Sequence, residues 1–300
     1  MTFSIVAFDP DKGDVGIAVA SKFLAVGAVV PWLEAGVGAV ATQSFVNARY
    51  GPDGLDLLRR GEEPITAAQL LTAADDQRAV RQLGMVDCQG RAATFTGDEC
   101  LDWAGGVIGT GVAIQGNILA GPQVVAAMEA AWLATAGAQL VERLMAALLA
   151  GDRAGGDRRG RQSASVHVKR KGAGYGGATD QLVDLRVDDH VDPVPELHRL
   201  IDIHTLLFGS TPDSEWVVVD EAVAEKIRAA LRGEGSSIAA AGPWDELLEA
   251  ALLGWVINEN LDERWSSGDR IDPVVLNHLL SKTIFSGFLM RANGSCVRMP

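Results

Sequence analysis

The chain opens with two apolar runs, residues 2–8 and 15–21, separated by the turn signal Asp-Pro-Asp-Lys-Gly-Asp. This pattern predicts a β-hairpin, and if its strands pair without a bulge, Thr2 lies opposite Ser21. Neither face of the hairpin alternates between polar and apolar residues in the usual way, so both faces are expected to be covered. Antiparallel strands buried on both faces indicate a layered sandwich, with another sheet beneath and helices above.

Further strands and short helices are predicted as far as about residue 207. Strands are expected within 26–44, 80–96, 112–119, 163–171 and 181–188, and helices at 52–60, 64–74, 122–150 and 192–207. The region after residue 208 is poorer in glycine, and its amphipathic patterns at 244–256 and 273–284 predict helices. We therefore expect an α+β protein with two domains, 1–208 and 209–300, of which the second is small and mostly helical.

Composition excludes several classes of protein. A hydrophobic content of 48% in 300 residues is enough for a large core. The 26 basic and 39 acidic residues give a net charge of −13, which argues against nucleic acid and anionic membranes as partners. Three cysteines without metal-ligand spacing favour a reducing, cytoplasmic location, with no structural metal, no cofactor and no disulfide framework. The N-terminus does not resemble a signal peptide, and glycines and Pro122 interrupt the longest uncharged stretch, so no membrane span is expected.

Thr2 carries the most suggestive chemistry. An initiator methionine is generally removed when the next residue is as small as threonine. Removal of Met1 would leave one residue with both a hydroxyl nucleophile and a free amine to act as its base. Lys22, next to Ser21 on the returning strand, would lower the pKa of that amine from its usual value of about 7.7–8.0. A small residue at position 2 is common, however, so the dipeptide alone does not establish this role.

Polar groups elsewhere are candidates for the walls of a substrate cleft. Uncharged amides in the apolar stretch Gln115-Gly116-Asn117 must be hydrogen-bonded if they are buried. The Asn117 side chain or the Gly116 N–H could donate to a developing oxyanion, although an ordinary structural amide network explains them equally well. Asn47 and Arg49 follow one predicted strand and are expected to bind substrate together with Gln115 and Gly116.

Six segments between Thr2 and about Leu207 carry a resemblance: TFSIVAFDP, GIAVASKFLAVGAVVPW, GVGAVATQSFVNARYG, AIQGNILAG, GGDRRGRQSAS and VDLRVDDHVDPVPEL. Together they resemble the uncharacterised bacterial family DUF1028, which is placed among the N-terminal-nucleophile (Ntn) hydrolases. The resemblance implies a four-layer αββα sandwich of antiparallel sheets, with Thr2 at the position of the nucleophile. Other positions in the family motifs, which we expect to be catalytic or to contact substrate, are Ser21, Lys22, Asn47, Asn117, Asp157 and Ser163.

The C-terminal region also shows a resemblance. Residues 258–265 (NENLDERW) and 270–276 (RIDPVVL) are similar to a small domain named for peptidoglycan binding, which is often appended to this family.

Two hypotheses of function follow. In the first, the chain is an Ntn-type amidohydrolase: mature Thr2 attacks a small amide or peptide-like substrate through an acyl-enzyme, with Lys22 and Asn117 assisting. In the second, the chain is a non-catalytic protein that binds a small ligand or a cell-wall fragment on the same scaffold. Sandwiches of this kind often associate, so a homo-oligomer is also expected.

Overall fold

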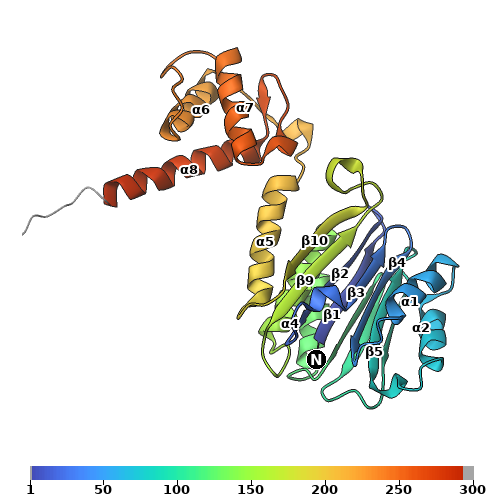
Figure 1. Ribbon diagram of the computed structural model, residues 1–300. Helices are drawn as coiled ribbons and strands as arrows, with labels where there is room; N and C mark the ends of the chain where they lie inside the picture. Colours follow the sequence, from blue (N-terminus) through green and yellow to red (C-terminus); the bar gives the residue numbers. More distant parts are fainter. Residues whose placement is uncertain (1, 293–300) are drawn as a thin grey trace, which may run out of the picture. The chain divides into compact units, whose positions relative to one another are not determined.

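The computed structural model describes residues 2–292 (Figure 1). The chain divides into two compact units, Met1–Leu200 and Ile201–Pro300. The division falls within helix α5 (Pro193–Phe208), whereas the sequence placed it at the end of that helix.

A six-stranded antiparallel sheet in the order β10-β9-β2-β1-β8-β7 forms half of the first unit. Its strands are β1 (Thr2–Asp9), β2 (Asp14–Ser21), β7 (Gly105–Gly109), β8 (Val112–Asn117), β9 (Ser163–Lys169) and β10 (Gln181–Val187). Phe8 pairs with Val15, and the ladder continues without a bulge to Phe3 and Ala20. The predicted N-terminal hairpin is therefore confirmed, whereas strand β7 has no counterpart in the sequence prediction.

A four-stranded antiparallel sheet faces the first sheet. It consists of β3 (Pro31–Glu34), β4 (Gly38–Ser44), β5 (Arg81–Asp87) and β6 (Ala92–Thr96). Val6 and Ile17 of the first sheet share one buried core with Ala39, Ala41 and Val86 of the second. Apolar packing between the two sheets is the largest stabilising contribution that this region can supply.

Helices cover the outer face of each sheet. Helices α1 (Tyr50–Arg59) and α2 (Pro64–Ala73) pack on the four-stranded sheet. Helices α3 (Gln123–Ala134) and α4 (Leu140–Arg153) lie on the six-stranded sheet. The sequence predicted a helical stretch over 122–150 that is interrupted at Gly137, and the chain does turn there, with a φ of +87° that is accessible to glycine without strain.

The second unit has its own core. Helices α6 (Glu221–Gly233), α7 (Glu246–Asn258) and α8 (Pro273–Ala292) enclose it, together with the two-residue strands β11 (Val217–Val218) and β12 (Arg270–Ile271). Asp220 and Asp245 cap α6 and α7 by accepting hydrogen bonds from backbone N–H groups. Helix α6 was not predicted, although the Asp220 cap marks its start.

The observed class is α+β, with antiparallel sheets and a helical C-terminal region, as the sequence predicted. Among residues 2–292, none of the helices combines the length and apolar character that a bilayer span requires. Across the same residues, no group of three or more His, Cys, Asp or Glu side chains is placed to hold a metal ion.

Candidate functional site

Four hydroxyl and amide side chains form a row across one end of the six-stranded sheet. Thr2 of β1 pairs with Asn117 of β8, and Ser21 of β2 pairs with Ser163 of β9. The Thr2 and Ser21 hydroxyl oxygens lie 3.2 Å apart. Side chains alternate along a strand, so Thr2 shares the inter-sheet face with Val6, and the row replaces the apolar core at this end of the sandwich.

A buried network of amides lies against this row from the opposite sheet. Gln43 of β4 and Gln82 of β5 are both fully buried. The Nε2 of Gln43 donates to Gln82 Oε1 at 2.8 Å, and Asn117 Nδ2 donates to the same oxygen at 2.9 Å. Together with Thr2, Ser21 and Asn117, the network residues Ser4, Gln43, Gln82 and Gln115 are called the Thr2 site below.

Backbone carbonyls fix the orientation of the amides in this network. Gln82 Nε2 donates to the Gly116 carbonyl oxygen at 2.8 Å and to that of Gly105 at 3.3 Å. A carbonyl oxygen only accepts hydrogen bonds, so Gln82 must direct its own oxygen towards Asn117. Asn117 must then present its NH2 group to Gln82, which leaves Asn117 Oδ1 buried without a hydrogen-bond partner in the described part of the chain.

The sequence suggested that the Asn117 side chain donates to an oxyanion. One N–H of its NH2 group is donated to Gln82, and a role of the second N–H at an oxyanion stays a prediction. The atom left unsatisfied next to Thr2 is an acceptor. A buried acceptor without a partner costs about 1–3 kcal/mol, so a donor that reached Asn117 Oδ1 would recover this cost.

Gln115 and Gly116 belong to the interior of the same network. Gln115 is fully buried, and its Nε2 donates to the Ser4 hydroxyl at 2.7 Å. Ser4 in turn donates to Gln43 Oε1 at 2.7 Å. The sequence expected Gln115 and Gly116 to contact substrate; the structure instead uses the Gln115 side chain and the Gly116 carbonyl to order the network.

Asp157 and Ser163 hold the loop that follows Ser21. The Asp157 carboxylate accepts the backbone N–H of Lys22 at 2.8 Å. The Ser163 hydroxyl donates to the Phe23 carbonyl and accepts from the Val26 N–H at 3.0 Å. Both residues also line the cavity described below, and their expected contact with substrate stays a prediction.

The side chain of Lys22 extends into solvent. Its Nζ donates to the Arg161 carbonyl oxygen at 3.2 Å. An exposed ammonium group influences the pKa of a neighbouring amine only weakly, because water screens the charge. The role of Lys22 in tuning the Thr2 amine stays a prediction.

A cavity of about 380 Å³ adjoins the Thr2 site. Ser21, whose hydroxyl lies beside that of Thr2, forms part of its wall. Phe3, the residue after Thr2, forms another part. Thr2 itself is 6% exposed with Met1 preceding it. Ser21, whose hydroxyl contacts that of Thr2, thus connects the buried network to a space of the size expected for a small ligand.

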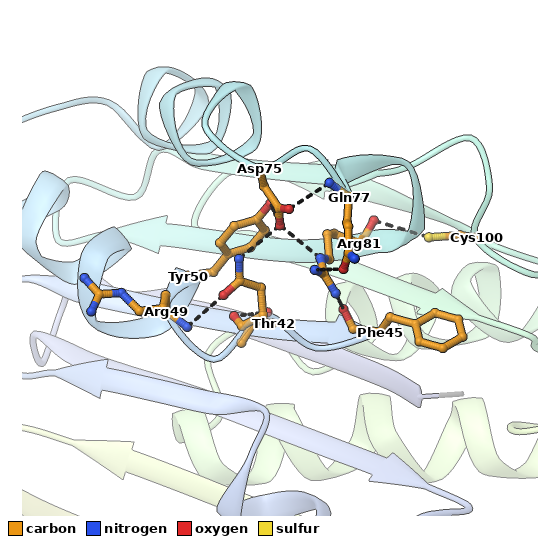
Figure 2. Close-up of polar contacts among 9 residues, drawn as sticks. Thr42, Phe45, Arg49, Tyr50, Asp75, Gln77, Arg81 and Cys100 are labelled. Carbon is orange, nitrogen blue, oxygen red and sulfur yellow. Dashed lines mark hydrogen bonds and ion pairs between the residues drawn. The ribbon is translucent and has the colours of Figure 1, made fainter.

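Asn47 belongs to a separate cluster, around Asp75 (Figure 2). The Asp75 carboxylate accepts hydrogen bonds from Asn47 Nδ2 at 3.0 Å, the Tyr50 hydroxyl at 2.9 Å, Arg81 Nε at 2.9 Å and the Gln77 N–H at 2.9 Å. These five residues are called the Asp75 cluster below. Asn47 therefore fixes the start of α1, a structural use that the sequence did not predict.

Arg49 lies apart from the Thr2 network. Its exposed guanidinium pairs with Asp53 one helical turn later, at 3.0 Å. Such exposed pairs contribute little to stability, and the expected binding of substrate by Arg49 stays a prediction.

The hydrogen bonds in the Asp75 cluster shift the pKa values of two side chains. Burial alone would raise the pKa of Asp75, but the bonds from Asn47 and Arg81 outweigh it and hold that pKa well below its usual range. Burial and the bond to Asp75 raise the pKa of the Tyr50 hydroxyl above its usual value. The cluster is therefore a stable set of an ionised carboxylate and a neutral phenol.

Backbone strain marks the loops around the Thr2 site. Ala25, Ser44 and Ile118 all adopt positive φ angles, of 51°, 68° and 51°. Ser44 directly follows Gln43 and Ile118 directly follows Asn117. A β-branched residue such as isoleucine rarely adopts this conformation, and such strain, worth about 1–3 kcal/mol per residue, gathers at functional sites.

Sequence reasoning missed Gln43 and Gln82, the two residues that orient the network. A signal was present, because each is an uncharged amide next to an apolar run of its strand. The strained positions carried no signal, since none of them is a glycine.

Two known protein families match parts of this chain. Residues 2–197 match the model described as "Family of unknown function (DUF1028)". The chain belongs to the DUF1028 family. Residues 207–279 match the model described as "Putative peptidoglycan binding domain". Both resemblances inferred from the sequence are thereby confirmed.

A solved member of the DUF1028 family has a similar structure. It is the crystal structure of protein SPO2555 from Silicibacter pomeroyi, which is 34% identical to this chain and superposes with a TM-score of 0.62. The match covers 71% of this chain and 90% of that one. No curated protein matches the chain.

Proposed function

We propose that this DUF1028 protein is an Ntn-type amidohydrolase that acts on a small amide or peptide-like substrate. Removal of Met1 would make Thr2 the first residue, with its hydroxyl as nucleophile and its amine as base. The contact of the Thr2 hydroxyl with that of Ser21, which lines a cavity, supports this proposal.

The reaction requires no group beyond the substrate and water. The Thr2 hydroxyl transfers its proton to the α-amine as Oγ1 bonds to the amide carbon. The resulting tetrahedral intermediate collapses when the C–N bond breaks and the α-ammonium protonates the departing nitrogen. Water then attacks the ester carbon and transfers a proton to the same amine. The ester C–O bond breaks as the α-ammonium returns this proton to Thr2 Oγ1, which releases the acid product and restores free Thr2.

The unsatisfied oxygen of Asn117 is the observation that carries the proposal. Asn117 pairs with Thr2, and directly paired residues have Cβ atoms about 4.5–5.5 Å apart. Processing would create one new donor group at this point, the α-amine of Thr2. We infer that Asn117 Oδ1 accepts a hydrogen bond from this amine and so directs its lone pair towards the Thr2 hydroxyl.

The first experiment combines intact-mass measurement with variants at Thr2. We expect purified protein to lack Met1 and to hydrolyse members of a panel of small amides and peptides. Thr2→Ala should lower turnover by at least about three orders of magnitude, whereas Thr2→Ser, which retains the hydroxyl, should keep measurable activity. Full retention of Met1 would contradict the proposal, as would unchanged turnover in Thr2→Ala.

The role of Asn117 has a separate readout. Asn117→Leu removes the acceptor at similar volume, and a neutral acceptor stabilises an ammonium more than an amine. We therefore expect the acid limb of the kcat/KM profile to move to lower pH while kcat falls. A reduced kcat with an unmoved profile would indicate only a structural role for Asn117.

The C-terminal family match favours a second candidate, a non-catalytic binder of cell-wall fragments. This hypothesis expects saturable binding of muropeptides by the full chain, indifferent to Thr2→Ala. Turnover that depends on Thr2, without muropeptide binding, would decide against it.

A further inference from the structure

The cavity beside the Thr2 site has an apolar side and a charged rim. Phe3, Val191, Pro193 and Val194 supply apolar wall, and Ser21 supplies the hydroxyl nearest Thr2. The charged residues in the wall are Asp152, Arg153, Asp157 and Arg161. The charge of a ligand that the cavity can bind depends on which of these side chains are not already paired.

Both carboxylates in the wall are already neutralised. Asp152 accepts two hydrogen bonds from Arg161, at 2.7 Å and 2.9 Å. Asp157 accepts from Arg159 at 3.2 Å and from the Lys22 backbone at 2.8 Å. Carboxylates satisfied in this way have little capacity left to bind a cationic ligand.

The remaining N–H groups of Arg161 are partly used as well. Its Nη1 donates to Asp192, at 3.0 Å. Arg161 is therefore shared between two carboxylates and acts as a structural bridge.

Arg153 is the cation that is left over. It is the last residue of α4 and lines the cavity. No carboxylate within the described residues 2–292 forms an ion pair with its guanidinium. A single arginine fork without a partner, at the rim of a partly apolar cavity, suits one planar carboxylate group.

We infer that the cavity selects amide substrates that also carry a carboxylate, and that Arg153 binds this carboxylate. The inference rests on the proposed function, because it assigns a substrate class to the cavity beside Thr2. A dianionic ligand fits less well, since the wall offers one uncompensated cation next to two carboxylates. Arg153 is then a residue for substrate selection and not for the chemical step.

The test uses two probes that differ only in charge, N-acetylalanine and N-acetylalaninamide, each as both enantiomers. The full-length protein carries Thr2→Ala, so the probes are not consumed, and binding is followed by ligand-observed NMR. We expect the carboxylate to bind at least about tenfold more tightly than the amide, because charge-assisted bidentate hydrogen bonds are stronger than those between neutral groups.

Variants at two arginines separate recognition of the carboxylate by Arg153 from a general effect of positive charge on the protein surface. Arg153→Gln should remove the preference, and Arg153→Lys should retain part of it. Arg158→Gln is the matched control, because Arg158 is an exposed arginine of the adjoining loop that does not line the cavity. Equal binding of the two probes, no detectable binding of either, or the same loss in Arg158→Gln would overturn the inference.

The two proposals can fail separately. Carboxylate-selective binding that depends on Arg153, without hydrolysis by the protein that retains Thr2, would defeat the proposed function alone. Hydrolysis that depends on Thr2 but ignores the carboxylate would defeat only the assignment of Arg153.

Discussion

The Thr2 site and the Asp75 cluster are neighbours with opposite characters. In the β4–β5 ladder, Gln43 pairs with Gln82 and the next pair is Ser44 with Arg81. The first pair belongs to the Thr2 site and faces the other sheet. Arg81, one residue away, points to the opposite face and belongs to the Asp75 cluster.

The difference between them lies in what is left unsatisfied. In the Asp75 cluster, Asp75 accepts four hydrogen bonds, and Arg81 also donates to the Phe45 carbonyl and to Gln77, both at 2.6 Å. The Thr2 site is built from neutral groups but retains an unsatisfied acceptor at Asn117, strained loops and an adjoining cavity. Ionisable residues and shifted pKa values thus mark a structural anchor here, whereas the neutral cluster has the features of a functional site.

The largest effect on stability is expected from removing the charge of Asp75. Asp75→Asn keeps the shape of the side chain but leaves the Arg81 guanidinium without a carboxylate. Breaking a buried pair costs about 3 kcal/mol at the low end of the observed range, and these side chains are 11% and 12% exposed. Urea unfolding at pH 7 measures the loss.

The control for this variant is Asp53→Asn, which breaks the exposed Arg49–Asp53 pair and should hardly move the midpoint. Turnover at Thr2 should survive in the folded Asp75→Asn protein. A folded but inactive Asp75→Asn protein would contradict the comparison by placing Asp75 in the active site.

Much of the fold was predictable from local pattern. The apolar runs on either side of the Asp-Pro-Asp-Lys-Gly-Asp turn determine the hairpin that places Thr2 beside Ser21, because side-chain alternation and turn length together set register. Strand β7 escaped prediction because its sequence, Gly-Gly-Val-Ile-Gly, has too few side chains to show alternation.

The site was predictable in part. Thr2, Ser21, Asn117 and Ser163 are indeed neighbours, as strand ends in one sheet must be. Asn47 was misplaced because its amide lies beyond the end of β4, where loop geometry and not strand register decides its partner. The orientation of Asn117 could not be predicted, since it depends on carbonyls of β7 and β8 acting through Gln82.

The second-largest loss of stability is expected from a substitution within the Thr2 site. Gln82→Leu leaves the NH2 groups of Gln43 and Asn117 and the Gly116 carbonyl without a shared partner. Each buried polar group without a partner costs about 1–3 kcal/mol, and partial relaxation should bring the total to about 2–3 kcal/mol. Urea unfolding measures this loss, and turnover should fall as well, because Asn117 is no longer oriented.

Gln69→Leu, at an exposed glutamine of α2, is the matched control and should change neither quantity. If Gln82→Leu lowered stability but left turnover intact, the network would be structural, like the Asp75 cluster.

The smallest effect is the loss of one hydrogen bond in Tyr50→Phe. Removing the hydroxyl that donates to Asp75 should cost about 1 kcal/mol at pH 7.

The stability of the Asp75 cluster should also depend on pH in two directions. The pKa of Tyr50 is raised in the folded state, so its contribution is fully present below the unfolded value of about 10 and is lost as pH rises towards the folded value. The pKa of Asp75 is lowered, so its contribution is present above about 3.9 and is lost as pH falls below that value.

The chain has only 2 tyrosines, so absorbance can isolate Tyr50. In Tyr175→Phe, which removes the exposed tyrosine, the phenolate absorbance of Tyr50 should appear only above about pH 10, together with unfolding. Tyr50→Phe should instead show no loss of structure at that pH. Ionisation of Tyr50 at its usual pKa in the folded protein would mean that the Asp75 cluster is open to water, and its contrast with the Thr2 site would then disappear.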